Sequence, residues 1–106
     1  MAISDQKCEP CQVGTPPLSS KQAEALIKET PEWMLKDNSI ERVFKFKDFR
    51  ESMDFVNRVA EIAEEQGHHP DIHINYNRVR LVLITHKIGG LSINDFIVAA
   101  KVDKLV

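Results

Sequence analysis

The spacing of apolar residues changes repeatedly along this chain, and these changes restrict its fold more than any other feature. Between residues 48 and 66, apolar side chains recur every three or four positions, which is the pattern of a helix with one buried face. The segments before and after it alternate apolar and polar residues, as half-buried strands do. Because 106 residues are the size of one domain, these segments must share a single core.

Two β-hairpins are predicted, one on each side of the long helix. Residues 32–36 and 40–47 predict the strands of the first, with a turn at Asp37-Asn38. Residues 72–76 and 79–85 predict the strands of the second. Hairpins separated by a helix favour an antiparallel sheet over the parallel sheet of strictly alternating strands and helices.

The last of these strands differs from the others because its apolar residues are consecutive. A turn is predicted before it at Asn77-Arg78, and the run Leu81-Val82-Leu83-Ile84 follows. Such a run is typical of a central strand that is covered on both faces. We expect helices to cover one face and another subunit to cover the other.

Capping residues predict where the helices begin and end. Asp48 and Glu51 resemble a capping box at the start of the long helix, and Gly67 can adopt the left-handed conformation that ends it. Ser92 and Asp95 have the same spacing at the start of a last helix. The predicted order is α-β-β-α-β-β-α, an α+β fold in which three helices pack on one face of a four-stranded antiparallel sheet.

An arm precedes this domain. Residues 1–17 hold three of the five prolines and no sustained apolar periodicity, so we expect a loosely ordered arm, followed by a single domain over residues 18–106. The first short helix of the domain begins at Ser19 or Ser20, and Pro31 stops it.

Both cysteines of the chain lie in the arm. Cys8-x-x-Cys11 resembles half of a zinc or redox motif, but a two-cysteine site needs further ligands. One interpretation is a metal shared between subunits, and the other is two thiols that bind no metal. Two cysteines are too few for the disulfide framework of a small secreted domain, which favours a reducing cytoplasm.

Charge and hydropathy argue against nucleic acid and membrane as partners. The chain has 14 Lys and Arg against 16 Asp and Glu, a formal charge of −2, without the basic excess that contacts to nucleic-acid phosphates need. The longest unbroken apolar run, Phe96–Ala100, is too short to span a membrane, and the first residues lack the apolar stretch of a secretory signal. We therefore expect a cytoplasmic protein that binds neither nucleic acid nor membrane.

Chemistry-bearing residues gather after the long helix. His68 and His69 are adjacent and cannot share a helix face, so we expect them in a loop where both can flank one ligand. His86 joins them if that loop lies beside the end of the central strand. Imidazoles donate and accept protons near neutral pH, which suits acid–base catalysis. The alternatives are an exposed, inert pair and a metal site, although adjacent ligands are unusual in common metal motifs.

Several ordered elements around these histidines resemble the pterin-4a-carbinolamine dehydratase family over roughly residues 18–103. These elements are Glu64-x-x-x-His68-His69-Pro70, Tyr76-Asn77-x-Val79, Thr85-His86 and Gly90-Leu91-Ser92-x-x-Asp95. The resemblance implies an antiparallel α+β fold, homodimers that extend the sheet, and often homotetramers. It also implies dehydration of 4a-hydroxytetrahydrobiopterin to quinonoid dihydropterin, without metal or cofactor, in tetrahydrobiopterin recycling after an aromatic amino acid hydroxylase.

This reaction needs one proton donor and one proton acceptor beside the substrate. The resemblance implies that His68 and His86 share these roles and that His69 orients the pterin, and it leaves open which of the first two is the donor. It also implies that Asp95 orients a catalytic imidazole. A helix-start carboxylate favoured by the helix dipole explains Asp95 equally well.

The resemblance implies that the remaining residues of the signature bind or orient the substrate. Glu64 hydrogen-bonds within the site or lies on a solvated helix face, and Thr85 contacts the pterin or serves as an ordinary strand residue. Pro70 keeps the preceding residue extended. Outside the signature, we expect His73 to be exposed on its strand and Trp33 to lie in the core rather than in the pocket wall.

Two other functions stay open. Vertebrate members of the family also act as dimerisation cofactors of a homeodomain transcription factor, so a protein-binding module is one alternative, and its binding should be indifferent to substitution of the histidines. The other is a His-ligated metallohydrolase, which should contain stoichiometric metal. Neither the side chain of the pterin nor the choice between dimer and tetramer can be read from the sequence.

Overall fold

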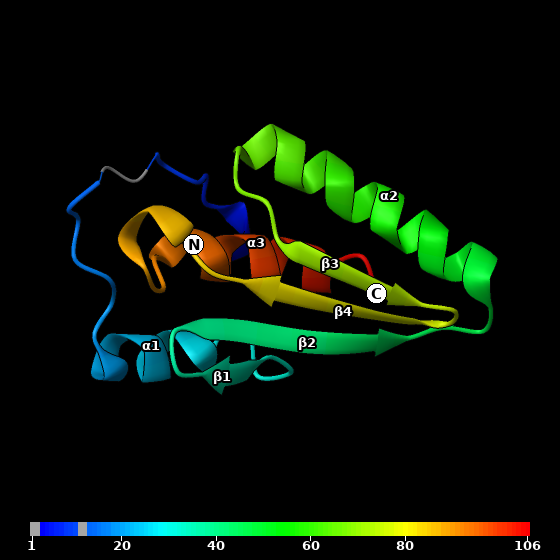
Figure 1. Ribbon diagram of the computed structural model, residues 1–106, viewed down its shortest axis with the longest axis horizontal. Coiled ribbons are helices and arrows are strands. Elements are labelled where there is room, and N and C mark those ends of the chain that lie inside the picture. Colours follow the sequence, from blue (N-terminus) through cyan, green and yellow to red (C-terminus); the bar gives the residue numbers. More distant parts are fainter. Residues whose placement is uncertain (1–2, 11–12) are drawn as a thin grey trace.

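The computed structural model describes residues 3–10 and 13–106, and it has the predicted α+β architecture (Figure 1). The described elements are η1 Ile3–Asp5, α1 Ser20–Ile27, β1 Met34–Lys36, β2 Ser39–Lys45, α2 Phe49–Gln66, β3 Asp71–Asn75, β4 Arg78–Leu83, η2 His86–Ile88 and α3 Ile93–Asp103. The predicted order of helices and strands is therefore confirmed, and the short 3-10 turns η1 and η2 are additions to it. No helix within the described residues is both long and apolar enough to cross a membrane.

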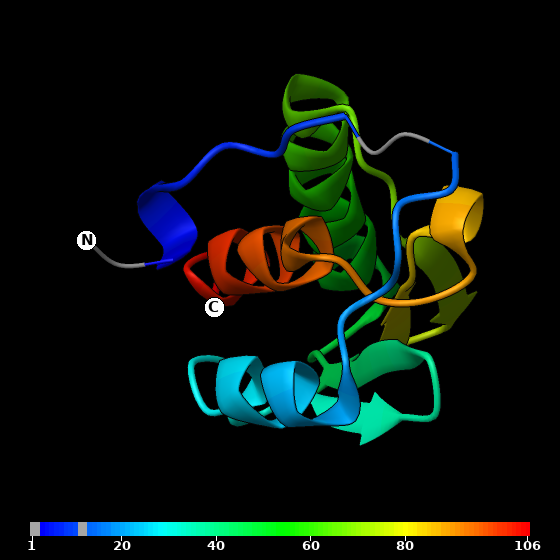
Figure 2. The same cartoon turned by 90° about the vertical axis from the view of Figure 1, so that its left-hand side faces the viewer.

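The strands form one antiparallel sheet in the order β1-β2-β4-β3, and Figure 2 shows the helices on one side of it. On that side β2, β4, α2 and α3 bury the core residues Ile40, Phe44, Val59, Val79, Leu81, Leu83 and Phe96. The predicted central position of β4 is confirmed.

Among the described residues, only one face of β4 is fully covered. Leu81 and Leu83 are fully buried against the helices, whereas Arg80 and Val82, which point to the other face, are half-buried. The strand therefore alternates despite its apolar run, because neighbouring side chains of a strand face opposite ways. Cover of the second face by another subunit stays a prediction.

The predicted caps fix both ends of α2. The Asp48 side chain accepts a hydrogen bond from the Glu51 backbone N–H at 2.9 Å, and the Glu51 carboxylate accepts one from the Lys47 N–H at 3.0 Å. Gly67 ends the helix in the left-handed conformation with φ +65°. This glycine releases the chain from the helix axis one residue before the first histidine.

Strand boundaries differ from the sequence prediction by one or two residues, and two of the differences have a visible cause. The first strand begins at Met34 because the side chain of Trp33 is buried and its Nε1 donates to Asp103 Oδ1 at 2.8 Å, which confirms Trp33 as a core residue. The second hairpin turns at Tyr76-Asn77, one residue earlier than predicted, with Tyr76 at φ +53°. Arg78 is thereby free of the turn and pairs with Lys45 of β2.

The described part of the arm lies against the domain. Ile3 packs on the core, and Lys101 Nζ donates to the Ser4 carbonyl at 2.8 Å. From there the arm runs past the C-terminal end of α2 toward α1 (Figure 2). Cys11 lies outside the described residues, so the structure does not test the Cys8-x-x-Cys11 motif.

Two buried threonines give opposite predictions for stability. Thr30 Oγ1 is buried with no hydrogen-bond partner among the described residues, whereas the buried Thr85 Oγ1 donates to Asp95. An unsatisfied hydroxyl costs desolvation free energy, so Thr30→Val should raise the free energy of unfolding by about 1 kcal/mol. Thr85→Val should lower it by about 1–3 kcal/mol, because it removes one of the hydrogen bonds to the buried Asp95 carboxylate. Urea unfolding measures both, and a Thr30→Val protein less stable than wild type would contradict the prediction.

Candidate active site

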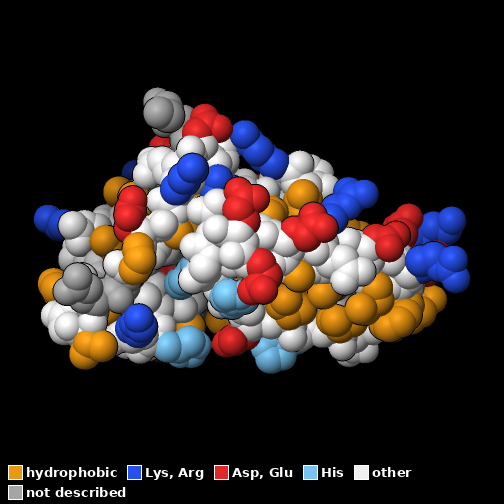
Figure 3. All heavy atoms as spheres, turned by 90° about the horizontal axis from the view of Figure 1, so that it is seen from above, with side chains coloured by type: hydrophobic (Ala, Val, Ile, Leu, Met, Phe, Trp, Pro, Cys, Tyr) orange, Lys and Arg blue, Asp and Glu red, His pale blue; other side chains and the backbone are white. Residues whose placement is uncertain are grey.

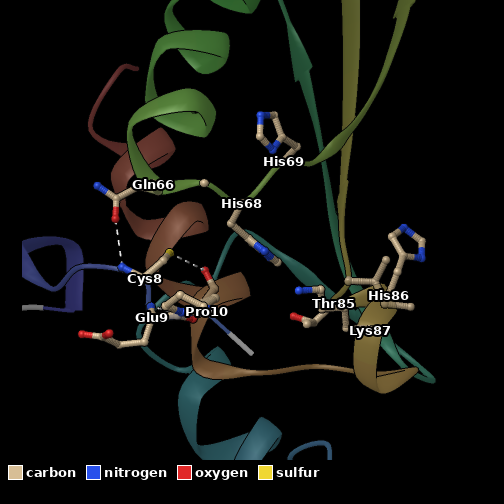
Figure 4. Close-up of a pocket in the computed structure, with 12 residues that line it drawn as sticks. Cys8, Glu9, Pro10, Gln66, His68, His69, Thr85, His86 and Lys87 are labelled. Carbon is tan, nitrogen blue, oxygen red and sulfur yellow. Dashed lines mark hydrogen bonds between the residues drawn. The ribbon is translucent and has the colours of Figure 1, made fainter. Parts of the chain in front are cut away.

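A cavity of about 400 Å³ lies between the C-terminal end of α2, the end of β4 and the arm (Figure 4). His68, His69, Thr85 and His86 line it, so the fold brings together the histidines that the sequence singled out. His73 is exposed on β3 and is not part of this lining, as expected.

His68 and Asp95 form the most closely defined contact of the site. Nε2 of His68 lies 2.6 Å from Oδ1 of Asp95, across 27 residues of sequence. The side chain of His68 is 13% exposed and that of Asp95 is 0% exposed. Asp95 therefore lies behind the histidine, away from solvent, while the imidazole faces the cavity.

The other oxygen of Asp95 is also occupied. Oδ2 accepts from Thr85 Oγ1 at 2.9 Å and from the Ser92 backbone N–H at 3.0 Å. The second contact is the helix-start role considered for Asp95, and the first ties α3 to the end of β4. Since Asp95 also contacts His68, the helix-start and histidine-contacting arrangements occur together.

This arrangement defines how His68 can exchange protons. An ionised carboxylate only accepts hydrogen bonds, so the Nε2 that faces it must carry the proton. Nδ1 is then the ring nitrogen left for a ligand, as an acceptor in the neutral ring and as a donor in the protonated one. The buried carboxylate thus selects the tautomer of the neutral ring.

His69 lies at the rim of the cavity. Its Nε2 is 2.6 Å from Oε2 of Glu64, on the last turn of α2, and the two side chains are 57% and 77% exposed. Water screens such an exposed pair, so this contact orients the ring more than it contributes to stability. Pro70 is buried and leads the chain into β3.

His86 reaches the cavity from the segment that follows β4. It begins η2 and is exposed, and Figure 4 shows its ring beyond Thr85. Thr85 N–H donates to the Gly90 carbonyl at 2.9 Å, which closes the loop that carries His86. Gly89 makes this closure possible because its φ of +67° is in the left-handed region.

Sequence reasoning did not anticipate the contribution of the arm. Cys8 and Pro10 line the cavity, together with Gln66 and Asn94, which hydrogen-bond to the arm. Asn94 stands beside Asp95 at a helix start, but no spacing distinguishes it from an ordinary polar helix residue. Among residues 3–10 and 13–106, no group of three or more His, Cys, Asp or Glu side chains is placed to hold a metal ion.

Comparisons with known proteins give a consistent result. The profile of the family described as pterin 4 alpha carbinolamine dehydratase matches residues 16–105. Relatives named "Putative pterin-4-alpha-carbinolamine dehydratase" include one from Nitrosomonas eutropha, 50% identical over 98% of this chain and 93% of its own length. Another, from Rubrobacter xylanophilus, is 47% identical over 97% of both chains.

Solved structures agree with the sequence relatives. The transcriptional coactivator/pterin dehydratase from Brucella melitensis superposes with a TM-score of 0.80 at 32% identity, over 84% of this chain and 97% of its own. A pterin dehydratase-like protein identified as a RuBisCO assembly factor in the alpha-carboxysome superposes with a TM-score of 0.57 at 26% identity, over 69% of this chain and 84% of its own. The extent of the profile match and the identity of the relatives show that this chain belongs to the pterin 4 alpha carbinolamine dehydratase family.

Proposed function

We propose that this protein catalyses the dehydration of 4a-hydroxytetrahydropterin to quinonoid dihydropterin and water. Membership of the family supports this reaction, and so does a cavity lined by imidazoles from two chain segments. The observation that carries the proposal is the 2.6 Å contact between His68 and the buried Asp95, because it gives one imidazole a defined tautomer beside the cavity.

The reaction moves two protons without net uptake or release. The hydroxyl on C4a receives a proton and leaves as water, while N5 loses its proton and forms a double bond with C4a. Water is a better leaving group than hydroxide, so proton donation lowers the barrier, and removal of the N5 proton lowers it further. Each such transfer contributes about 10²–10⁴-fold to the rate.

The site offers groups for both transfers. We assign His68 and His86 to share the acid and base roles, because they reach the cavity from different segments and can approach a flat substrate at different atoms. His69, held by Glu64 at the rim, orients the pterin. Thr85 lines the cavity, Pro70 orients the chain between His69 and β3, and Asp95 positions His68.

The proposed substrate suits the cavity. Ligand sites for small molecules have volumes of about 300–1,000 Å³, and this cavity of about 400 Å³ falls in that range. A net charge of −2 also suits a pterin, which has no phosphate groups to neutralise. We propose 4a-hydroxytetrahydrobiopterin as the substrate, supplied by an aromatic amino acid hydroxylase. The reaction would then be one step of tetrahydrobiopterin recycling in the cytoplasm.

Replacing the histidines tests the proposed reaction. Stopped-flow ultraviolet detection of carbinolamine dehydration should show a wild-type rate well above the spontaneous rate, and His68→Ala and His86→Ala should each lower kcat/KM by about 10²-fold. His73→Ala is the matched control, because His73 is exposed on β3 and should leave kcat/KM unchanged. If both cavity variants keep the wild-type kcat/KM, the acid and base assignment is wrong.

Two alternatives give different results in the same experiments. The Brucella protein is named a transcriptional coactivator as well as a pterin dehydratase, and the alpha-carboxysome protein is an assembly factor, so a protein-binding role is the second candidate function. A purely protein-binding chain would not accelerate dehydration at all. A His-ligated metallohydrolase would contain stoichiometric metal on elemental analysis and would be inhibited by chelators.

We also propose that copies of this chain associate as a homodimer or homotetramer. Strand β3 is an edge of the sheet, and it lies beside exposed apolar side chains. Ile74 is 39% exposed, Tyr76 62% and Phe49 50%, and Figure 3 shows hydrophobic side chains gathered along one flank of the molecule. Association would remove this apolar surface from water.

A charge at the β3 edge should weaken this association. Ile74→Asp should shift the mass measured by light scattering toward that of the 12.1 kDa monomer, because a buried carboxylate without a partner is costly. Asn38→Asp, in the exposed turn between β1 and β2, adds the same charge away from β3 and should keep the wild-type mass. A wild-type protein that is monomeric in this measurement would contradict association.

A further inference from the structure

We propose that the N-terminal arm positions His68 for catalysis by tying the end of α2 to the start of α3, with Gln66 and Asn94 as the positioning residues. The consequence for catalysis rests on the proposed function, whereas the consequence for the geometry of His68 does not. The family profile begins at residue 16, so the arm residues that make these contacts lie outside the part of the chain that the profile describes.

Two consecutive arm residues make the bridge. The backbone N–H of Cys8 donates to Gln66 Oε1 at 2.9 Å, and the backbone N–H of Glu9 donates to Asn94 Oδ1 at 3.1 Å. Gln66 is the last residue of α2, and Asn94 lies in the first turn of α3. Figure 4 shows the arm at this end of the cavity, with the contact between Cys8 and Gln66 drawn.

Asn94 binds the arm as a neighbouring strand would. Its Oδ1 accepts from the Glu9 N–H, and its Nδ2 donates to the Glu9 carbonyl at 2.6 Å, so one side chain pairs both backbone groups of one residue. Asn94 is only 4% exposed, and a buried amide is costly unless such partners satisfy it. The contact therefore couples the position of the arm to that of the α3 start.

The bridge ends beside both members of the His68–Asp95 pair. Gln66 lies two residues before His68, and Asn94 immediately precedes Asp95. The two helices meet in the site through the 2.6 Å contact of His68 with Asp95, which a small separation of the helix ends would lengthen. Misplacing a reacting group by about 1 Å can cost about 10²-fold in rate, so a second tie between these ends favours catalysis.

The arm is anchored independently of the bridge. Lys101 Nζ donates to the Ser4 carbonyl at 2.8 Å, and Ile3 packs on the core. Nζ of Lys104 also lies 3.8 Å from Oδ1 of Asp5. These contacts fix the beginning of the arm on α3. A local change at Glu9 should consequently disturb the bridge without detaching the whole arm.

A proline at residue 9 tests the bridge without altering the domain. Glu9→Pro removes the N–H that Asn94 accepts, because proline has no backbone N–H. Glu9→Ala is the matched reference, since it removes the same carboxylate and keeps the N–H. Thermal unfolding of both full-length variants establishes that the domain is folded in each.

Two readouts separate positioning from a merely structural role. In stopped-flow dehydration, Glu9→Pro should have a kcat about fivefold below that of Glu9→Ala, with KM within about twofold. In proton NMR, the strongly downfield Nε2–H signal of His68, expected for a short hydrogen bond to Asp95, should weaken or move upfield in Glu9→Pro only. Asn94→Ala, which removes the bridge from the domain side, should reproduce both effects.

Contrary results are equally distinct. Equal kcat values and an unchanged Nε2–H signal in the two Glu9 variants would overturn the proposal, and so would a rise in KM alone, which would make the arm only a wall of the cavity. If the wild-type protein does not dehydrate the carbinolamine, the proposed function fails and the NMR comparison alone decides whether the arm positions His68.

Discussion

The buried carboxylate of Asp95 is the group on which the arrangement of this site depends. A carboxylate removed from water costs several kcal/mol unless both oxygens find partners, and here the partners come from different parts of the chain. Thr85 follows β4, Ser92 precedes α3 and His68 follows α2, and all three bond to the same carboxylate. Satisfying one buried carboxyl group therefore sets the ends of three elements relative to one another and fixes the imidazole between them.

The order of elements and the helix ends were predictable because local patterns determine them. Apolar periodicity located α2, and Asp48 and Gly67 marked its ends before any tertiary contact was known. Two of the boundaries that differed have other causes. Trp33 leaves the first strand to reach Asp103, 70 residues away, and Tyr76 takes the left-handed conformation that moves the turn. Neither the contact of Trp33 nor the backbone conformation of Tyr76 can be read from the spacing of apolar residues.

The candidate site was predictable in its residues more than in its contacts. The ordered signature named His68, His69, His86 and Asp95, but it could not decide between a helix-start role and a histidine contact for Asp95, because both use the same position. The contribution of the arm escaped prediction for a different reason. The side chain of Asn94 binds the backbone of the arm rather than its side chains. Such contacts produce no pattern of apolar residues, so the sequence does not reveal them.

Three of the four histidines should form one pterin site, and a binding titration tests this most directly. Side-chain NMR signals of all four can be followed while a stable 7,8-dihydropterin is added to the full-length protein. A shared site predicts saturating shifts at His68, His69 and His86, with His73, exposed on β3, as the internal reference that does not move. Unshifted cavity histidines, or a shift at His73 as large as theirs, would contradict it.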